Sequence, residues 1–105
     1  MSQTDAAVAA NVAVVERWLG SFGRRWPSPQ DLDELLAADI VFVERPNMLK
    51  PAGDERDGEG MRTGIEMGRK LMAWQTYEVR DHVADGDTVV TRMRWTRELA
   101  IDAGP

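Results

Sequence analysis

The pattern that most constrains this chain is a pair of strand-like segments in its last third. Residues 77–84 and Thr88–Leu99 are rich in β-branched and aromatic side chains, and only Asp85-Gly86-Asp87 separates them. The central glycine can adopt the positive φ that tight hairpin turns require. The sequence therefore predicts a long antiparallel hairpin. Its second segment is up to a dozen residues long, a length that suits a bent sheet.

Two helical patterns stand at the start of the chain. Over residues 5–22, apolar side chains recur at alternating steps of four and three, which places them on one stripe of a helix. We expect this stripe to face the sheet, and it consists of Val8, Val12, Val15, Leu19 and Phe22. Ser28, Pro29 and Asp31 then give an N-cap, a first-position proline and an acidic first turn. They predict a short second helix that buries Leu32, Leu35 and Leu36.

The middle of the chain combines a strand, an irregular segment and a third helix. The apolar run at 40–45 ends before Pro46, which predicts a first strand. Residues 50–60 concentrate glycine, proline and charge without an apolar period, which predicts a loop or a mobile lid. We interpret its acidic residues as a solvated charge run. A helical face follows, made of Met61, Ile65, Gly68 and Met72.

Two glycines interrupt this third helical pattern. Gly64 and Gly68 each weaken a helix by about 1 kcal/mol relative to alanine. Their presence fits a place where the backbone approaches another group closely. A poorly optimised surface turn is the alternative interpretation.

Composition narrows the class of protein. A chain of 105 residues fits one domain, over residues 1–105, and 43% hydrophobic with 30% charged residues is typical of a folded protein. The net charge of −5 argues against nucleic acid as a partner. The absence of cysteine excludes disulfides and thiolate metal sites and fits a reducing cytoplasm. No apolar run approaches the roughly 20 residues that cross a bilayer, so we expect a cytoplasmic protein without membrane insertion.

Two passages resemble the SnoaL-like, nuclear-transport-factor-two-like domains. The family's second helix and first strand are similar to DLDELLAADIVFVERPNM, and its third helix with the following hairpin is similar to RTGIEMGRKLMAWQTYEVRDHVADGDTVVTRMRW. The resemblance extends from about residue 5 to the last residue. It implies an α+β fold in which a curved antiparallel sheet wraps around helices, as a cone or half-barrel, to make one pocket.

The same resemblance implies that part of the fold is missing. The family's last two strands usually supply pocket residues, and they have no counterpart before the closing IDAGP. We therefore expect a domain that is incomplete at its C-terminus and a Thr88–Leu99 strand with an open edge, which proteins usually cover by pairing or burial. A second copy of the chain could cover that edge instead.

Glu44 is the candidate catalytic residue. It shares a face of the first strand with Phe42 and, by resemblance, lies near the carboxylate base of the family's ketosteroid isomerases. An apolar wall disfavours the charged form of a carboxylate, which brings it toward the proton affinity that a shuttling base needs at neutral pH. The alternative is that Glu44 pairs with Arg45 or Lys50 at the rim, in water.

Candidate ligand-binding residues lie on three segments: Phe42, Trp74, Tyr77, Arg92 and Arg94. The two aromatic residues Trp74 and Tyr77 stand between the third helix and the hairpin, where rings line pockets as readily as they fill cores. The arginines could bind a ligand carboxylate or phosphate, or pair in solvent with Glu78 or Asp81.

The alternation of the long strand leaves its inner face undecided. Arg92 and Arg94 share one face, and Met93 and Trp95 share the other. Arg92 can be placed at the arginine of the family's epoxide hydrolases, but Arg94 stands where those enzymes carry an aspartate. This departure counts against epoxide hydrolysis.

His82 is the only histidine. Strict alternation groups it with Glu78, Arg80 and Ala84, opposite Tyr77, which predicts a solvent-facing side chain. One histidine is too few for a zinc or iron site, so we expect neither a metal nor a cofactor.

Three functions are compatible with these patterns, because the family also includes polyketide cyclases and members without known chemistry. The first is a pocket that binds a small apolar or amphipathic molecule. The second is an isomerase or cyclase-type enzyme that uses Glu44 as a general base. The third is a homodimeric interaction module whose interface contains Met93 and Trp95. A homodimer is also compatible with the first two.

Overall fold

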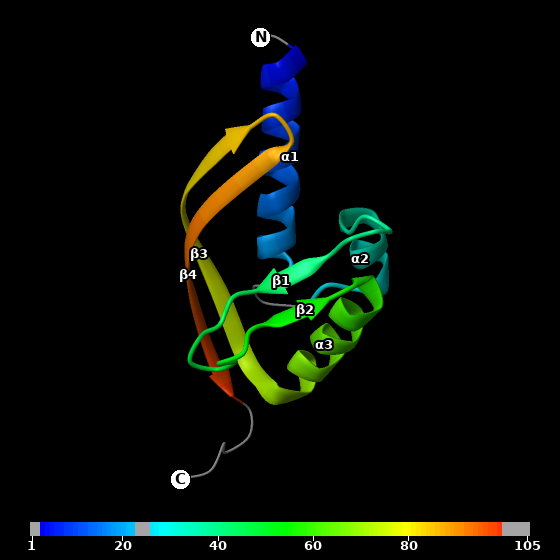
Figure 1. Ribbon diagram of the computed structural model, residues 1–105, viewed down its shortest axis with the longest axis vertical. Helices are drawn as coiled ribbons and strands as arrows, with labels where there is room; N and C mark the ends of the chain where they lie inside the picture. Colours follow the sequence, from blue (N-terminus) through cyan, green and yellow to red (C-terminus); the bar gives the residue numbers. More distant parts are fainter. Residues whose placement is uncertain (1–2, 23–25, 100–105) are drawn as a thin grey trace.

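The computed structural model describes residues 3–22 and 26–99 (Figure 1). In these ranges the chain forms three helices and four strands, and the strands pair antiparallel in two separate sheets. In chain order, the elements are α1 (Gln3–Gly20), α2 (Pro29–Leu35), β1 (Phe42–Glu44), β2 (Asp54–Arg56), α3 (Gly58–Leu71), β3 (Met72–Asp85) and β4 (Thr88–Leu99). The expected α+β class is confirmed, with an open sheet. The closing residues 101–105, where the sequence suggested that the domain is incomplete, lie outside the described residues.

The long hairpin predicted from the sequence is a bowed ribbon of β3 and β4, with α1 alongside it (Figure 1). Gly86, in the turn, has a φ of +57°, as the turn pattern required. The ribbon starts earlier than predicted, because β3 begins at Met72 and not at residue 77. Met72 was expected on the third helix, but its φ of −108° and ψ of 129° are extended and end α3. On α1 the predicted stripe is confirmed, since Val8, Val12 and Val15 are half-buried and Leu19 is buried; Phe22, expected on the same helix, is buried just beyond its end at Gly20.

An irregularity in β3 decides which residues face inward. Val79 pairs with Met93 and Asp81 pairs with Arg92, so Arg80 is an extra residue without an opposite partner. The alternation shifts by one at this point, and His82 joins the face that carries Tyr77. The predicted solvent-facing position of His82 is therefore wrong, because strict alternation does not survive a bulge.

The ribbon consequently has two distinct faces, which we name by their position relative to α1. The inner face carries Gln75, Tyr77, Val79, His82 and Ala84 of β3 with Val89, Thr91, Met93, Trp95 and Arg97 of β4. The outer face carries Trp74, Thr76, Glu78, Asp81 and Val83 of β3 with Val90, Arg92, Arg94, Thr96 and Glu98 of β4. Trp95 thus lies on the inner face, not on an outer dimerisation face.

The sequence predicted a loop or lid over residues 50–60, but only part of this segment is a loop. Its middle forms β2, which pairs with β1 in the register Phe42–Arg56 and Glu44–Asp54. Its end begins α3, where the Asp57 side chain accepts a hydrogen bond from the Gly60 amide at 2.8 Å as an N-cap. Gly53 has a φ of +72°, and a β-carbon there would stand 2.6 Å from the Glu44 carbonyl oxygen, so this turn requires glycine.

The core lies where α1, α2 and α3 meet the ribbon. Phe22, Leu32 and Ile65 are its buried centre. The predicted capping of α2 is confirmed, because the Ser28 hydroxyl accepts from the Asp31 amide at 3.1 Å and the Asp31 carboxylate accepts from the Ser28 amide at 2.9 Å.

Gly64 and Gly68 of α3 mark close approaches, as one of the two interpretations proposed. A β-carbon on Gly68 would lie 3.0 Å from the Trp26 ring, and one on Gly64 would overlap the Arg56 guanidinium. Both contacts lie on the side of α3 that faces the core, so the alternative of a surface turn is wrong.

Candidate functional site

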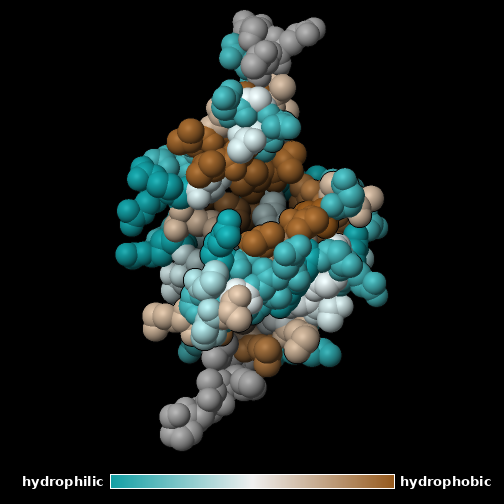
Figure 2. Space-filling model, in the orientation of Figure 1, coloured by the Kyte–Doolittle hydropathy of each residue, from teal (hydrophilic) through white to brown (hydrophobic). Residues whose placement is uncertain are grey.

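A hollow of about 200 Å³ lies between α1, α3, β1 and the inner face of the ribbon. Six aromatic residues line it: Trp18, Phe22, Trp26, Phe42, Tyr77 and Trp95. Figure 2 shows hydrophobic residues gathered around a recess in the middle of the face that it displays. Two wider depressions of about 450 and 430 Å³ lie where β2 meets α3, but no aromatic side chain lines either of them. We therefore place the candidate site in the aromatic hollow.

The rings of the hollow form a connected network. Phe22 is edge-on to Trp18, Trp26 and Tyr77, with centroid distances of 4.9, 5.5 and 6.0 Å. Tyr77 stacks on Trp95, its partner across the ribbon, with centroids 6.1 Å apart and planes 8° apart. Edge-to-face and stacked pairs are favoured by the ring quadrupole. The wall is thus shaped by its own contacts before any ligand binds.

Gln75 joins this wall through a hydrogen bond. The Trp95 indole Nε1 donates to Gln75 Oε1 at 2.9 Å, and the Arg97 guanidinium lies 4.1 Å from the centroid of the Trp95 ring. Only 2% of the Gln75 surface is exposed. Sequence reasoning missed Gln75 and assigned no ligand role to Trp95. The available signal was the spacing of Gln75 and Tyr77, which puts both on one face of a strand.

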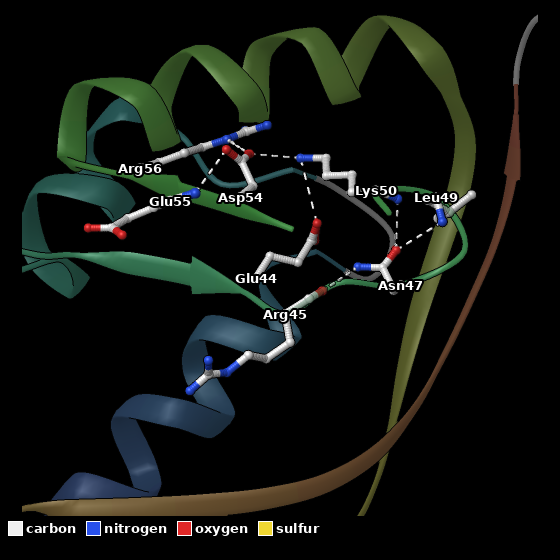
Figure 3. Close-up of polar contacts among 8 residues, drawn as sticks. All are labelled: Glu44, Arg45, Asn47, Leu49, Lys50, Asp54, Glu55 and Arg56. Atoms are coloured by element: carbon white, nitrogen blue, oxygen red, sulfur yellow. Dashed lines mark hydrogen bonds and ion pairs between the residues drawn. The ribbon is translucent and has the colours of Figure 1, made fainter. Parts of the chain in front are cut away.

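The opposite wall is polar and internally paired (Figure 3). Lys50 Nζ lies 2.9 Å from Asp54 Oδ2 and 3.6 Å from Glu44 Oε2, and Arg56 Nε donates to the same Asp54 oxygen. Hydrogen bonds from Lys50 and Arg56 hold the pKa of Asp54 below its ordinary value, against the opposing effect of burial. Glu44 lines the hollow, as expected, and also sits beside Lys50. Each of the two interpretations of Glu44 therefore describes part of its surroundings.

Asn47 organises the turn that delivers Lys50 to this wall. Its side-chain oxygen accepts hydrogen bonds from the amides of Leu49 and Lys50, at 2.9 and 3.1 Å, and its amide nitrogen donates to the Arg45 carbonyl at 2.8 Å (Figure 3). The Lys50 carbonyl in turn accepts from the Gly53 amide at 2.8 Å. The first part of the segment expected to be a mobile lid is therefore a hydrogen-bonded turn, which orients Lys50 toward the polar wall.

Half of the predicted site residues point away from the hollow. Phe42, Tyr77 and Glu44 line it. Trp74, Arg92 and Arg94 belong to the outer face, because they alternate with residues that line the hollow or pack on α1. The Trp74 indole donates to Glu98 Oε2 at 2.6 Å.

Arg92 has a partner on the outer face. Its Nε donates to Asp81 Oδ1 at 2.8 Å, and a second bond joins its Nη2 to Asp81 Oδ2. This pairing lowers the pKa of Asp81 and raises the pKa of Arg92. Of the two interpretations offered for this arginine, the solvated cross-strand pair describes what the structure contains.

His82 serves a different part of the inner face. Its Nε2 lies 3.0 Å from Glu16 Oε1 on α1, and its Nδ1 lies 2.8 Å from Thr91 Oγ1 on β4. The mostly buried imidazole thus ties the far half of the ribbon to α1. Within residues 3–22 and 26–99, no three histidine, aspartate or glutamate side chains are grouped so that they could hold a metal ion.

Comparison with known proteins adds one finding. A family model described as the SnoaL-like domain matches residues 15–104, which run from the second half of α1 through β4. Comparison with curated proteins and comparison with solved structures gave no match. Over the ranges that the structure describes, every helix is too short or too polar to cross a membrane.

Proposed function

Because this chain belongs to the SnoaL-like domain family, we propose that it binds a small apolar or amphipathic molecule in the aromatic hollow. The observation that carries the proposal is the lining, in which six rings surround about 200 Å³ and a few polar groups gather on one side. Pockets of this composition bury apolar ligands through ring contacts and orient them through their polar groups.

The charges of the hollow favour a ligand without net charge. Glu44 and Asp54 carry two negative charges, and Lys50 and Arg56 carry two positive ones within the same ion-paired group. A charged ligand would have to break one of these pairs, which leaves a partly buried charge without its partner. A neutral molecule leaves all of them in place.

The four tryptophans allow a direct test by protein-observed nuclear magnetic resonance. Naphthalene and tetralin, two neutral bicyclic probes, should move the indole N–H signals of Trp18, Trp26 and Trp95, which line the hollow. The signal of Trp74, on the outer face, serves as the internal control and should stay in place. Saturable shifts at Trp74 alone, or none at the three lining residues, would refute the proposal.

A matched pair of variants on β1 sharpens this test. Phe42→Ala removes one ring of the lining and should weaken binding of both probes by about fivefold to tenfold, a loss typical of one aromatic contact. Val43→Ala, the neighbouring exposed position on the same strand, should change nothing. Equal affinities of the two variants would show that the probes bind elsewhere.

A second candidate function is enolisation of a bound ketone with Glu44 as the general base. The observation that favours it is that Glu44 and Tyr77 line the same hollow. The carboxylate would take a proton from the carbon beside the carbonyl. The C–H electron pair would then form a carbon–carbon double bond, and the carbonyl π pair would move to oxygen. Return of the proton to the same carbon restores the ketone, whereas in an unsaturated ketone its delivery to the far carbon of the conjugated enolate moves the double bond and completes an isomerisation; either way the carboxylate is regenerated.

Deuterium exchange tests this chemistry without knowledge of the natural substrate. In deuterated water, the protein should accelerate exchange of the α-hydrogens of α-tetralone, and Glu44→Gln should abolish that acceleration. Glu55→Gln, on the exposed side of β2, is the control. Exchange that persists in Glu44→Gln would remove the catalytic role from Glu44.

The expected homodimer also remains a proposal, and the structure changes the residues that it would use. Met93 and Trp95 lie on the inner face, whereas the outer face presents Val83 and Val90, cross-strand partners that are 68% and 57% exposed. We therefore propose the outer face as the interface between copies. Light scattering should give twice the mass of one chain, and Val83→Lys should halve it. A wild-type monomer at tens of micromolar would rule the dimer out.

A further inference from the structure

We infer that Gln75 and Tyr77 form a pair of hydrogen-bond donors that receives one carbonyl oxygen of the ligand. The inference rests on the proposed binding function and names the ligand class: a neutral cyclic or aryl ketone, aldehyde or quinone. Trp95 is the positioning residue of the pair, since it holds Gln75 by a hydrogen bond and stacks on Tyr77.

The first step is the orientation of the Gln75 amide. The indole Nε1 of Trp95 can only donate, so the Gln75 atom that faces it at 2.9 Å has to be the oxygen. The amide –NH₂ group therefore points away from Trp95. An orientation that is ambiguous in many amides is settled here by the chemistry of the neighbour.

The second step is that this –NH₂ group lacks a partner. Gln75 Nε2 makes no hydrogen bond with any residue in the described ranges, although Gln75 is only 2% exposed. Every fully enclosed side-chain nitrogen or oxygen in those ranges has a partner. The Gln75 nitrogen is thus not sealed in the core, and since Gln75 lines the hollow, we infer that this nitrogen faces it. A donor buried this far is favourable only when an acceptor meets it.

The third step is the neighbouring donor. Tyr77 lies two residues further on the same face of β3, and its hydroxyl makes no hydrogen bond with a residue that the structure describes. Burial raises the pKa of this phenol above its ordinary value, while Arg97 lowers it and Glu44 raises it to smaller extents. The hydroxyl therefore keeps its proton at neutral pH and is available as a donor.

The last step is the choice of acceptor. Both groups offer hydrogens and neither carries charge, so their complement is a neutral atom with two lone pairs, as in a carbonyl oxygen. An anionic acceptor would bring a further negative charge into the hollow that Glu44 already lines. The surrounding rings select a flat ring skeleton behind that oxygen. The aromatic rings of the wall thus select the shape of the ligand, and the two donors select its carbonyl group.

The experiment compares α-tetralone with tetralin, which has the same skeleton without the carbonyl. Wild-type protein should bind the ketone about tenfold more tightly than the hydrocarbon, as expected for one or two hydrogen bonds made in a dry site. The carbonyl stretching frequency of the bound ketone should fall below its value in hexane. Tyr77→Phe keeps the ring but removes the hydroxyl, so it should weaken binding of the ketone severalfold relative to binding of tetralin and raise the carbonyl stretching frequency of the bound ketone.

Two further variants complete the design. Gln75→Met removes the amide at similar volume and should also reduce the preference for the ketone. Trp74→Phe removes a hydrogen-bonding indole from the outer face of the same strand and should leave the preference intact. Equal binding of ketone and hydrocarbon by the wild type, or a preference that survives in both Tyr77→Phe and Gln75→Met, would overturn the inference and leave the binding function standing. Failure of both compounds to bind folded wild-type protein would overturn the binding function as well.

Discussion

Trp95 and Trp74 belong to the same ribbon and are almost equally exposed, at 41% and 43%, yet they do different work. Trp95 lies on the inner face, where it stacks on Tyr77 and donates to the buried Gln75. Trp74 lies on the outer face, where it donates to Glu98. The comparison teaches that a side chain's role here depends on which neighbours it orders more than on how much of it is covered. On the outer face one contact can be removed without disturbing the others. On the inner face the contacts depend on one another, so the loss of one side chain affects several neighbours.

The largest expected difference between the faces is in stability. Trp95→Ala should lower the free energy of unfolding by about 3 kcal/mol, because it removes ring contacts and leaves Gln75 Oε1 without its donor. Trp74→Ala should cost less than about 1 kcal/mol, as surface substitutions usually do. Urea unfolding of both variants measures the difference. Equal costs would break the distinction between the two faces.

A second contrast concerns polar contacts. His82→Ala removes two hydrogen bonds that join β3 to Glu16 and Thr91, and should lower the free energy of unfolding by about 1 to 2 kcal/mol. Arg92→Ala removes a pair exposed to water on the outer face, and should have a much smaller effect that disappears at high salt. Unfolding curves at low and high salt check both. A salt-insensitive cost for Arg92→Ala would give the outer pair more weight than we assign it.

The inner face also predicts an alkaline titration that is simple to observe, because Tyr77 is the only tyrosine. Its pKa should lie above the ordinary 10.0, with burial as the main cause. Since the pKa of Tyr77 is higher in the folded than in the unfolded state, the neutral phenol contributes to folding stability. This contribution is fully present below the unfolded-state pKa and is lost as pH rises through the folded-state pKa. Ultraviolet absorbance of tyrosinate gives the pKa. Glu44→Gln should move it part of the way down, and an unchanged value would mean that Glu44 lies too far away to act on Tyr77.

The smallest effect is the acid titration of the outer face. The hydrogen bonds from Arg92 hold the pKa of Asp81 below its ordinary 3.8. Because the pKa of Asp81 is lower in the folded than in the unfolded state, the ionised carboxylate contributes to folding stability. This contribution is present above the unfolded-state pKa and is lost as pH falls through the folded-state pKa. Carboxyl carbon shifts should show the depressed pKa in the wild type and a return upward in Arg92→Gln. A pKa that ignores this substitution would mean that the pair does not persist in solution.

The sequence predicted those parts of the fold that are set by local chemistry. Asp85-Gly86-Asp87 marked the turn and Ser28 with Asp31 marked the start of α2, since the relevant hydrogen bonds or backbone angles involve residues close in the chain. The strand β2 could not be predicted in this way. Asp54-Glu55-Arg56 has no strand propensity, and only its pairing with β1 makes it extended.

The same distinction applies to the candidate site. Phe42, Glu44 and Tyr77 were found because each stands out by residue type on a predicted strand. Gln75 and Trp95 were not, because their role depends on which face of the ribbon turns inward. That choice follows from the packing against α1, and the extra residue in β3 prevents simple alternation from carrying it along the strand. Trp74, Arg92 and Arg94 were assigned to the site for want of this information.

The extra residue at Arg80 allows the two halves of β3 to change independently. On one side of it the strand serves the hollow through Gln75 and Tyr77, and on the other it serves α1 through His82. The β3–β4 ladder already shifts register at two places, between Met72 and Trp74 and between Val79 and Asp81, so a single insertion or deletion beside Arg80 could re-aim the α1-binding half while the ligand-facing half keeps its pairing. Insertions and deletions would then be tolerated more readily beside Arg80 than within the stretch from Gln75 to Val79.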